Sequence, residues 1–168
     1  MLDEPSDSRE ARAARKQISH GPIVKTLLAG QRPDGGFSIH PYVPKWTGTH
    51  WRLVSLVELG IPPGYRPAVK AANQVLKWLN GKAHRRIIKQ INGLTRRCAS
   101  QEGNALAVCS RLDLAEDPRG VQLAEWLVEW QWPDGGWNCD RRPEADHSSF
   151  YESLPTLWGL VEYQRATG

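Results

Sequence analysis

A seven-residue segment that occurs twice, 100 residues apart, constrains the fold of this chain more than any other feature. Residues 31–37 read Gln-Arg-Pro-Asp-Gly-Gly-Phe, and residues 131–137 read Gln-Trp-Pro-Asp-Gly-Gly-Trp. The likeness continues upstream without a gap, because apolar residues at 23, 27 and 28 correspond to apolar residues at 123, 127 and 128. Internal similarity at a fixed offset is typical of repeat architectures, so we expect stacked copies of one helical unit.

The residue types of this segment predict a turn between two helices. Proline lacks an N–H and disfavours helical geometry in the preceding residue, so it ends the first helix. Asp-Gly-Gly is turn chemistry, the aromatic residue covers the turn, and a glutamine side chain can satisfy free backbone groups at helix ends. We therefore expect structural roles, with catalysis by the two aspartates as the alternative. The residues concerned are Gln31, Asp34, Gly36, Phe37, Gln131, Asp134, Gly136 and Trp137.

Apolar spacings of three and four predict an all-α domain over residues 18–168, preceded by a flexible tail at 1–17. The predicted helical pairs are 20–31 with 49–59, 66–80 with 104–112, and 118–131 with 148–165. We expect no strands: the basic segment 84–97 is interpreted as a connector helix broken near Gly93. Residues 101–103 are interpreted as the trace of a lost glutamine–glycine turn.

Composition excludes several classes of protein. A length of 168 residues fits one domain, and 40% hydrophobic residues argue against disorder. The net charge of +4 is mild, and the arginine pairs at 85–86, 96–97 and 141–142 are expected on the surface, so no nucleic-acid partner is predicted. Three cysteines do not suggest a disulfide framework. No apolar run is long enough for a membrane span, and a polar N-terminus without a signal sequence favours a cytoplasmic location.

The segment Gln131-x-x-Asp134-Gly135-Gly136-Trp137 resembles the Gln/Trp motif of the squalene and terpenoid cyclases, whose helical unit recurs in protein prenyltransferase β subunits. The resemblance covers residues 18–168 and implies an α/α toroid, in which inner helices line a cavity and outer helices surround them. Three helical pairs would form only a half ring. The chain could therefore be a fragment of a longer toroid, a degenerate half, or a half ring that pairs with a second copy.

The catalytic signatures of that superfamily are missing. The aspartates stand at 3, 7, 34, 113, 117, 134, 140 and 146, so neither an Asp-x-Asp-Asp nor an Asp-Asp-x-x-Asp motif is present. Prenyltransferases hold zinc with Asp, Cys and His, and Cys139, Asp140 and His147 offer these types at a different spacing. We expect no cofactor, with zinc as the alternative, and interpret Cys98 and Cys109 as small hydrophobic residues.

The resemblance places the candidate site at the first turns of the helices that follow each glycine turn. His50, Asp140, His147 and Glu152 are the candidate acids and bases. Trp51, Arg52, Phe150 and Tyr151 are the candidate substrate-binding residues, because aromatic rings can stack on an isoprenoid or stabilise a cation. The alternative is structural: Thr49 caps its helix, Ser149 and Glu152 form a capping box, and the aromatic rings pack.

Two functions remain open at this stage. One is a cyclase- or prenyltransferase-like protein that handles a prenyl or other hydrophobic substrate without the usual Asp-rich motif. The other is a non-catalytic helical-repeat module that binds a partner through its concave face or its open end. A glycosidase is a more distant alternative that would need two facing carboxylates, such as Asp140 and Glu152.

Overall fold

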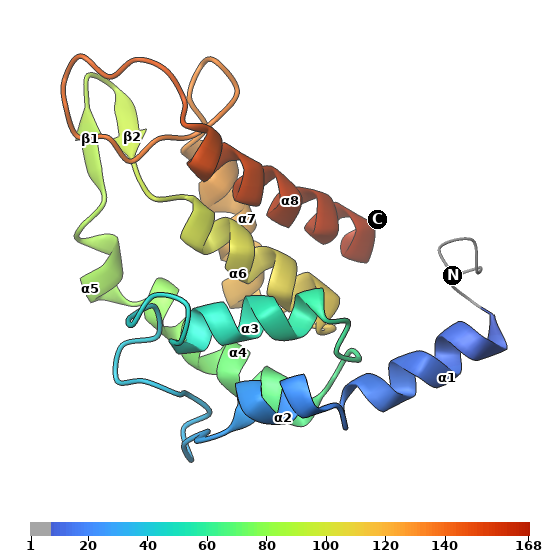
Figure 1. Ribbon diagram of the computed structural model, residues 1–168. Helices are drawn as coiled ribbons and strands as arrows, with labels where there is room; N and C mark the ends of the chain where they lie inside the picture. The colour runs from blue at the N-terminus through green and yellow to red at the C-terminus, as the bar shows by residue number, and fades with distance from the viewer. Residues whose placement is uncertain (1–7) are drawn as a thin grey trace.

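The computed structural model describes residues 8–168, which are mostly helical, as the apolar spacing predicted. Two short strands, β1 (Lys89–Ile91) and β2 (Leu94–Arg96), interrupt the helices (Figure 1). The helices are α1 (Arg9–Ile18), α2 (Pro22–Leu28), α3 (Thr49–Glu58), α4 (Arg66–Leu79), α5 (Lys82–Arg85), α6 (Ser100–Arg111), α7 (Pro118–Glu129) and α8 (Phe150–Thr167).

Helix α6 lies at the centre of the molecule. It contacts α3 on one side and α8 on the other, so these three helices form one row. Helices α4 and α7 both pack against α6 and contact each other, which makes them part of a second row. The three predicted helical pairs are in contact, namely α2 with α3, α4 with α6, and α7 with α8.

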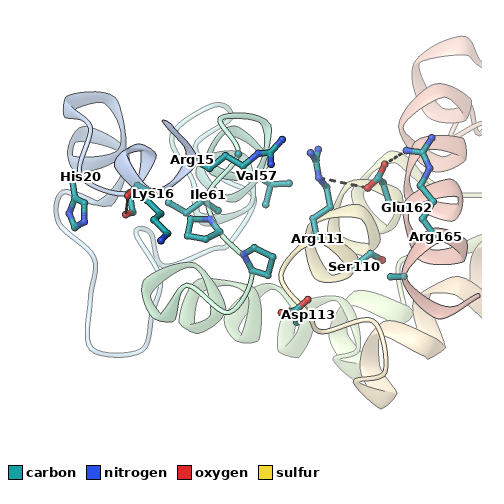
Figure 2. A pocket seen from close by; sticks show the side chains of 15 residues that line it. Arg15, Lys16, His20, Val57, Ile61, Ser110, Arg111, Asp113, Glu162 and Arg165 are labelled. Carbon is teal, nitrogen blue, oxygen red and sulfur yellow. Dashed lines mark hydrogen bonds and ion pairs between the residues drawn. The ribbon is translucent and has the colours of Figure 1, made fainter. Parts of the chain in front are cut away.

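The N-terminal segment and the far end of α8 border an open hollow. Helix α1 begins at Ser8, whose Oγ accepts a hydrogen bond from the backbone N–H of Ala11, and it covers much of the predicted tail. Residues 1–7 of that tail lie outside the described part of the chain. Between α1 and the C-terminal end of α8 lies an open hollow of about 760 Å³ (Figure 2).

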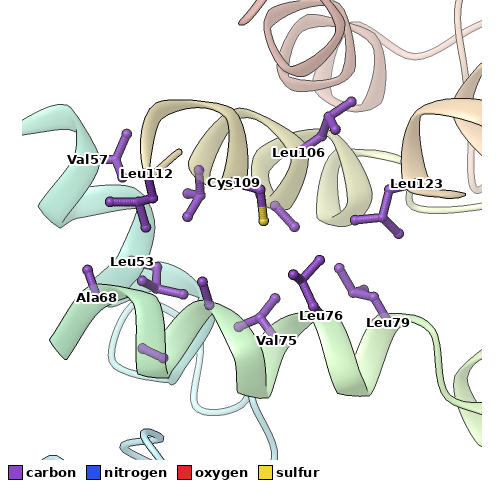
Figure 3. Packing of buried hydrophobic residues seen from close by; sticks show 14 of the residues in the cluster. Leu53, Val57, Ala68, Val75, Leu76, Leu79, Leu106, Cys109, Leu112 and Leu123 are labelled. Carbon is purple, nitrogen blue, oxygen red and sulfur yellow. The ribbon is translucent and has the colours of Figure 1, made fainter. Parts of the chain in front are cut away.

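The core lies between the two rows of helices. On α4 the buried residues recur at spacings of three and four (Ala68, Ala72, Val75 and Leu79), as the sequence predicted for this segment. They face buried residues of α6 such as Cys109 (Figure 3). Helix α6 is buried along most of its length because it has neighbours on every side.

Two glycines let α6 and α8 approach until their backbones touch. A methyl group added at Gly159 would overlap the backbone of Gly103, and one added at Gly103 would lie 2.5 Å from the Cα atom of Thr156. Side chains larger than hydrogen would separate the helices at this crossing. The crossing therefore sets the distance between the N-terminal ends of α6 and α8.

The expectation that the chain has no strands was wrong. Residues 84–97 are not a broken helix: α5 is followed by a hairpin in which β1 pairs with β2 in antiparallel register. Asn92 and Gly93 connect the strands with φ values of 52° and 75°. These positive angles are typical of the two-residue Asn-Gly turn that favours hairpins.

Two further sequence interpretations need correction. Residues 101–103 are not the trace of a turn, because they lie in the first turns of α6. Arg96 and Arg97 are not surface residues, because both are buried. Arg96 lies over the ring of Trp132 and donates to the Ala145 carbonyl (2.7 Å), which ties β2 to the loop between α7 and α8.

Within residues 8–168, no helix combines the length and the apolar character that crossing a membrane requires. This finding agrees with the absence of a membrane span that the sequence predicted.

We predict that Gly159→Ala lowers the free energy of unfolding by about 3 kcal/mol, because a core contact between two backbones cannot accept a methyl group. Urea denaturation followed by circular dichroism measures the change. Gly120→Ala is the matched control, since its nearest neighbour would be 3.3 Å away and its φ is not positive. Equal stability of both variants would contradict the close crossing.

Candidate functional site

The two glycine turns have the same backbone geometry. In the first turn the N–H of Arg32 donates to the Gly36 carbonyl, and in the second the N–H of Trp132 donates to the Gly136 carbonyl, both at 2.8 Å. An aspartate side chain closes each turn, because Asp34 Oδ1 accepts from Gly36 and Asp134 Oδ1 accepts from Gly136. The sequence repeat is therefore also a structural repeat.

The glutamine of each turn binds backbone carbonyls. Gln31 Nε2 donates to the carbonyls of Gly35 (2.9 Å) and Pro67 (2.8 Å), so it joins the first turn to the start of α4. Gln131 Nε2 donates to the Gly135 carbonyl at 2.8 Å. These contacts satisfy acceptors that the turn leaves free, which is the structural role expected for a glutamine here.

The aromatic residue differs between the two turns. The equivalent backbone carbonyl of the preceding helix nevertheless accepts a side-chain hydrogen bond in both. Trp137 Nε1 donates to the Leu127 carbonyl at the end of α7 (2.8 Å). In the first turn Phe37 has no such donor, and Arg52 stacks on its ring and donates to the Leu27 carbonyl (2.8 Å). Arg52 and Phe37 together thus supply the ring and the hydrogen-bond donor that Trp137 supplies alone. This structural contact accounts for the position of Arg52 without a substrate.

The second turn fixes the beginning of α8. Asp134 Oδ2 accepts from the N–H of Ser148 (2.7 Å), and this bond, followed by that of Gly136, lowers the pKa of the carboxyl group. The N–H of Ser149 donates to the Trp137 carbonyl (2.7 Å), and the N–H of Trp137 donates to Ser153 Oγ (3.1 Å). The entry to α8 is therefore held by at least three hydrogen bonds to the turn.

The expected capping box at the start of α8 is wrong, because the Ser149 side chain makes no capping hydrogen bond. Glu152 points to another element instead: its Oε2 accepts from the backbone N–H of Ser100 at the start of α6 (3.0 Å).

The expected cap of α3 also needs correction, because α3 starts after Gly48 and Thr49 is its first residue rather than its cap. The Thr49 hydroxyl oxygen accepts from the N–H of Phe37 (3.0 Å).

Glu152 lies beside two cysteines at the N-terminal ends of α6 and α8. Cys139 Sγ donates to Glu152 Oε1 (3.5 Å), and one side-chain ligand atom from each of Cys98, Cys139 and Glu152 lies within 4.8 Å of the others. We call these three residues the thiol–carboxylate cluster. A hydrogen bond between the two thiols lowers the pKa of Cys98 and raises that of Cys139, which burial raises further.

The structure places the remaining candidates of the α8 region outside this cluster. Asp140 accepts two-pronged hydrogen bonds from Arg142, and these bonds lower its pKa to about 2. His147 pairs with the neighbouring Asp146 and is exposed. Phe150 and Tyr151 point to solvent, with 72% and 84% exposure. Cys139, Asp140 and His147 are therefore not gathered into one metal site.

His50 lies in the core. Its side chain lines a small void with Ala72, Ala105 and Cys109, and its Nε2 is buried without a hydrogen-bond partner. Burial lowers the pKa of His50 to about 4, so the ring is neutral near pH 7. These surroundings favour a structural role over proton transfer at a substrate.

An aromatic groove lies next to the thiol–carboxylate cluster. Its volume is about 610 Å³. Trp78 forms its wall with rings on either side, at 5.0 Å from His40 and 4.5 Å from His84, and Tyr42 lies 6.1 Å away. Residues of the groove include Ile39, His40, Pro41, Tyr42, Trp78, Ile87 and Gln101.

Tyr42 links the aromatic groove to the rest of the predicted site. Its ring lies 5.1 Å from that of Trp51, which in turn lies 4.6 Å from that of Trp46. Burial raises the pKa of Tyr42, and a hydrogen bond with Gln101 opposes this effect. Of the predicted substrate-binding residues, only Trp51 joins this set of rings, and neither Tyr42 nor Trp78 was predicted from the sequence.

A buried ion pair between Arg97 and Glu102 contacts two residues that line the aromatic groove. Arg97 donates through Nε and Nη2 to the Glu102 carboxylate (2.7–3.1 Å), and it also donates to Gln101 Oε1 (2.7 Å). His84 Nε2 lies 3.0 Å from the same carboxylate. The pairing satisfies a charge that would be costly to bury alone, and it holds Gln101 at the edge of the groove.

The larger hollow at the opposite end of the helices has a different character. Arg111, Glu162 and Arg165 form ion pairs along its wall, as Figure 2 shows. Its lining mixes charged side chains, such as Lys16 and Asp113, with apolar ones, such as Val57 and Ile61, so it is more strongly charged than the aromatic groove.

Comparison with known proteins gave no matching family model, and no match among curated proteins or solved structures.

We predict that the stability of the protein falls as the pH decreases from about 6.5 to about 4, because His50 binds a proton when unfolded but not when folded. The full contribution, on the order of 3 kcal/mol, is present above pH 6.5. Urea denaturation at pH 7.5 and 4.5 measures it.

Replacement of His50 by leucine should remove most of this pH dependence, whereas replacement of the exposed His147 by asparagine should leave it unchanged. Identical slopes in wild type and His50→Leu would show that another group is responsible.

Proposed function

We propose that this chain is a partial α/α toroid that resembles the squalene and terpenoid cyclases and prenyltransferases, and that it handles a prenyl or other hydrophobic substrate. The aromatic groove between Tyr42 and Trp78 is the observation that carries the proposal. The groove exceeds the smallest size that is ordinary for small-molecule sites, which is about 300 Å³, and its mainly apolar lining includes the rings of Tyr42 and Trp78.

The helical arrangement supports the toroid part of the proposal. Both glycine turns connect helices that pack as a pair, and α3, α6 and α8 stand side by side in one row. The aromatic groove and the thiol–carboxylate cluster both lie near the N-terminal ends of these helices. The resemblance implies a site at this end, because there the inner helices open toward the cavity.

The chemistry of the groove supports an apolar ligand with a polar end. Ile39 and Ile87 are exposed at its rim, and apolar surface of this kind gains free energy when a hydrocarbon chain covers it. Tyr42 and Gln101 add a hydroxyl and an amide to the lining. Rings such as Trp78 also attract a cation when one forms or binds nearby.

Binding of farnesol, a prenyl alcohol, tests this function. We expect saturable quenching of tryptophan fluorescence, and a dissociation constant raised about tenfold by Trp78→Leu, which is the effect of losing about 1.4 kcal/mol of ring contact. Tyr151→Ala is the matched control, because its exposed ring lies on α8, outside the groove. Absence of saturation, or equal weakening by both variants, would contradict the proposal.

A second candidate function is a non-catalytic module that joins a second copy through its open end. An apolar stripe on α8 favours it: Phe150, Leu154, Leu157 and Val161 recur at helical spacing and are all exposed. An exposed stripe of this kind marks an interaction surface more often than a solvated face.

Light scattering at high protein concentration tests this second function. A dimer that Leu157→Glu converts to monomer, and that Gln164→Glu leaves intact, would support pairing through the stripe. A wild-type monomer at every concentration would contradict it.

A further inference from the structure

We propose that Cys98, Cys139 and Glu152 form a binding site for one Zn²⁺ ion, with a fourth coordination position left open by the protein. This ligand set differs from Cys139, Asp140 and His147, the alternative zinc ligands predicted from the sequence. The site is independent of the prenyl-binding function, since it rests on the cluster and not on the groove.

The spacing of the ligand atoms fits a tetrahedral zinc ion. With Zn–S and Zn–O bonds of about 2.3 Å and about 2.0 Å, tetrahedral angles place sulfur and oxygen ligands roughly 3.5 Å apart. Cys139 Sγ and Glu152 Oε1 lie 3.5 Å apart, and the Cys98 sulfur completes a triangle with no separation above 4.8 Å. These separations are close to those that one ion would require.

The ligand types also suit zinc. Thiolate sulfur and carboxylate oxygen are both zinc ligands in proteins, and three protein ligands with one open position are typical of catalytic rather than purely structural zinc. Tyr42, which lines the aromatic groove, is near enough to Cys98 and Glu152 to feel their charge, so the cluster is close to the groove.

The surroundings hold the ligands in place. Glu152 Oε2 accepts the N–H of Ser100, which leaves Oε1 directed at Cys139, and a second bond of this type commonly orients a metal-binding carboxylate. Cys139 follows a turn that is anchored to α8, and Cys98 precedes α6. The close crossing of α6 and α8 at Gly103 and Gly159 then holds the start of α6, which Cys98 precedes, against the helix that carries Glu152.

Zinc binds cysteine as the thiolate, so binding requires that both thiols lose their protons. A zinc ion accepts an electron pair from each sulfur, and both protons are released to solvent. No change of oxidation state takes place in this step.

Titration of the reduced full chain with Co²⁺ under anaerobic conditions tests the site. We expect one Co²⁺ per chain, a thiolate-to-cobalt charge-transfer band in the near ultraviolet, and loss of the band on addition of Zn²⁺. Cys98→Ser and Cys139→Ser should each remove about half of the band, because half of the sulfur ligands is lost. Glu152→Gln should keep the band and weaken binding roughly tenfold or more.

The controls separate this site from the other candidates. Asp140→Asn and His147→Asn together leave the titration unchanged if the ion binds at the thiol–carboxylate cluster. Cys109→Ser also leaves it unchanged, because this buried thiol belongs to the core. If the Asp140 and His147 variant loses binding, the ion binds at the other ligand set and the proposal fails.

A second measurement keeps the test decisive if a serine variant does not fold. In the wild-type chain, Zn²⁺ should protect Cys98 and Cys139 from alkylation by N-ethylmaleimide, as read by peptide mass spectrometry. Equal alkylation with and without Zn²⁺ overturns the proposal. If a Cys98–Cys139 disulfide is recovered and the reduced chain takes up no metal, the zinc proposal fails and the two cysteines are a redox pair.

Discussion

The attachment of the second glycine turn to the beginning of α8 is the constraint on which the candidate site depends. Asp134 and Trp137 receive or donate hydrogen bonds at Ser148, Ser149 and Ser153, so the turn and the helix form one rigid unit. Cys139 lies on this unit just after the turn, and Glu152 lies in the first turn of α8. The crossing of α8 with α6 then brings both residues to Cys98, which lies immediately before α6.

The two turns show how one backbone geometry can serve different surroundings. Trp137 reaches the last carbonyls of its preceding helix through its own indole, whereas Phe37 needs Arg52 for the equivalent bond. Arg52 is thereby committed to structure, and the adjacent His50 turns into the core. The first turn thus contributes the aromatic side of the candidate site through Tyr42, and the second contributes the thiol and carboxylate groups.

The sequence predicted the features that depend on local pattern and missed those that depend on the meeting of distant segments. Helical spacing predicted α4 and its buried face, because burial repeats every three to four residues. The Asn92-Gly93 pair was an available signal for the hairpin, and the basic residues around it obscured the alternating strands. The contact between Cys98 and Cys139 follows from the α6–α8 crossing, which no local pattern shows. Nor does any local pattern show that Arg97, Glu102 and His84 satisfy one another inside the protein.

The distance between the two sulfur atoms is the most direct measure of this account. Dibromobimane, a short reagent with two thiol-reactive arms, joins only cysteines that lie close together. We predict that it links Cys98 to Cys139 within one chain and leaves the buried Cys109 unmodified, as seen by peptide mass spectrometry. Separate single-arm labelling of Cys98 and Cys139, without a linked peptide, would contradict the arrangement of α6, α8 and the second turn described above.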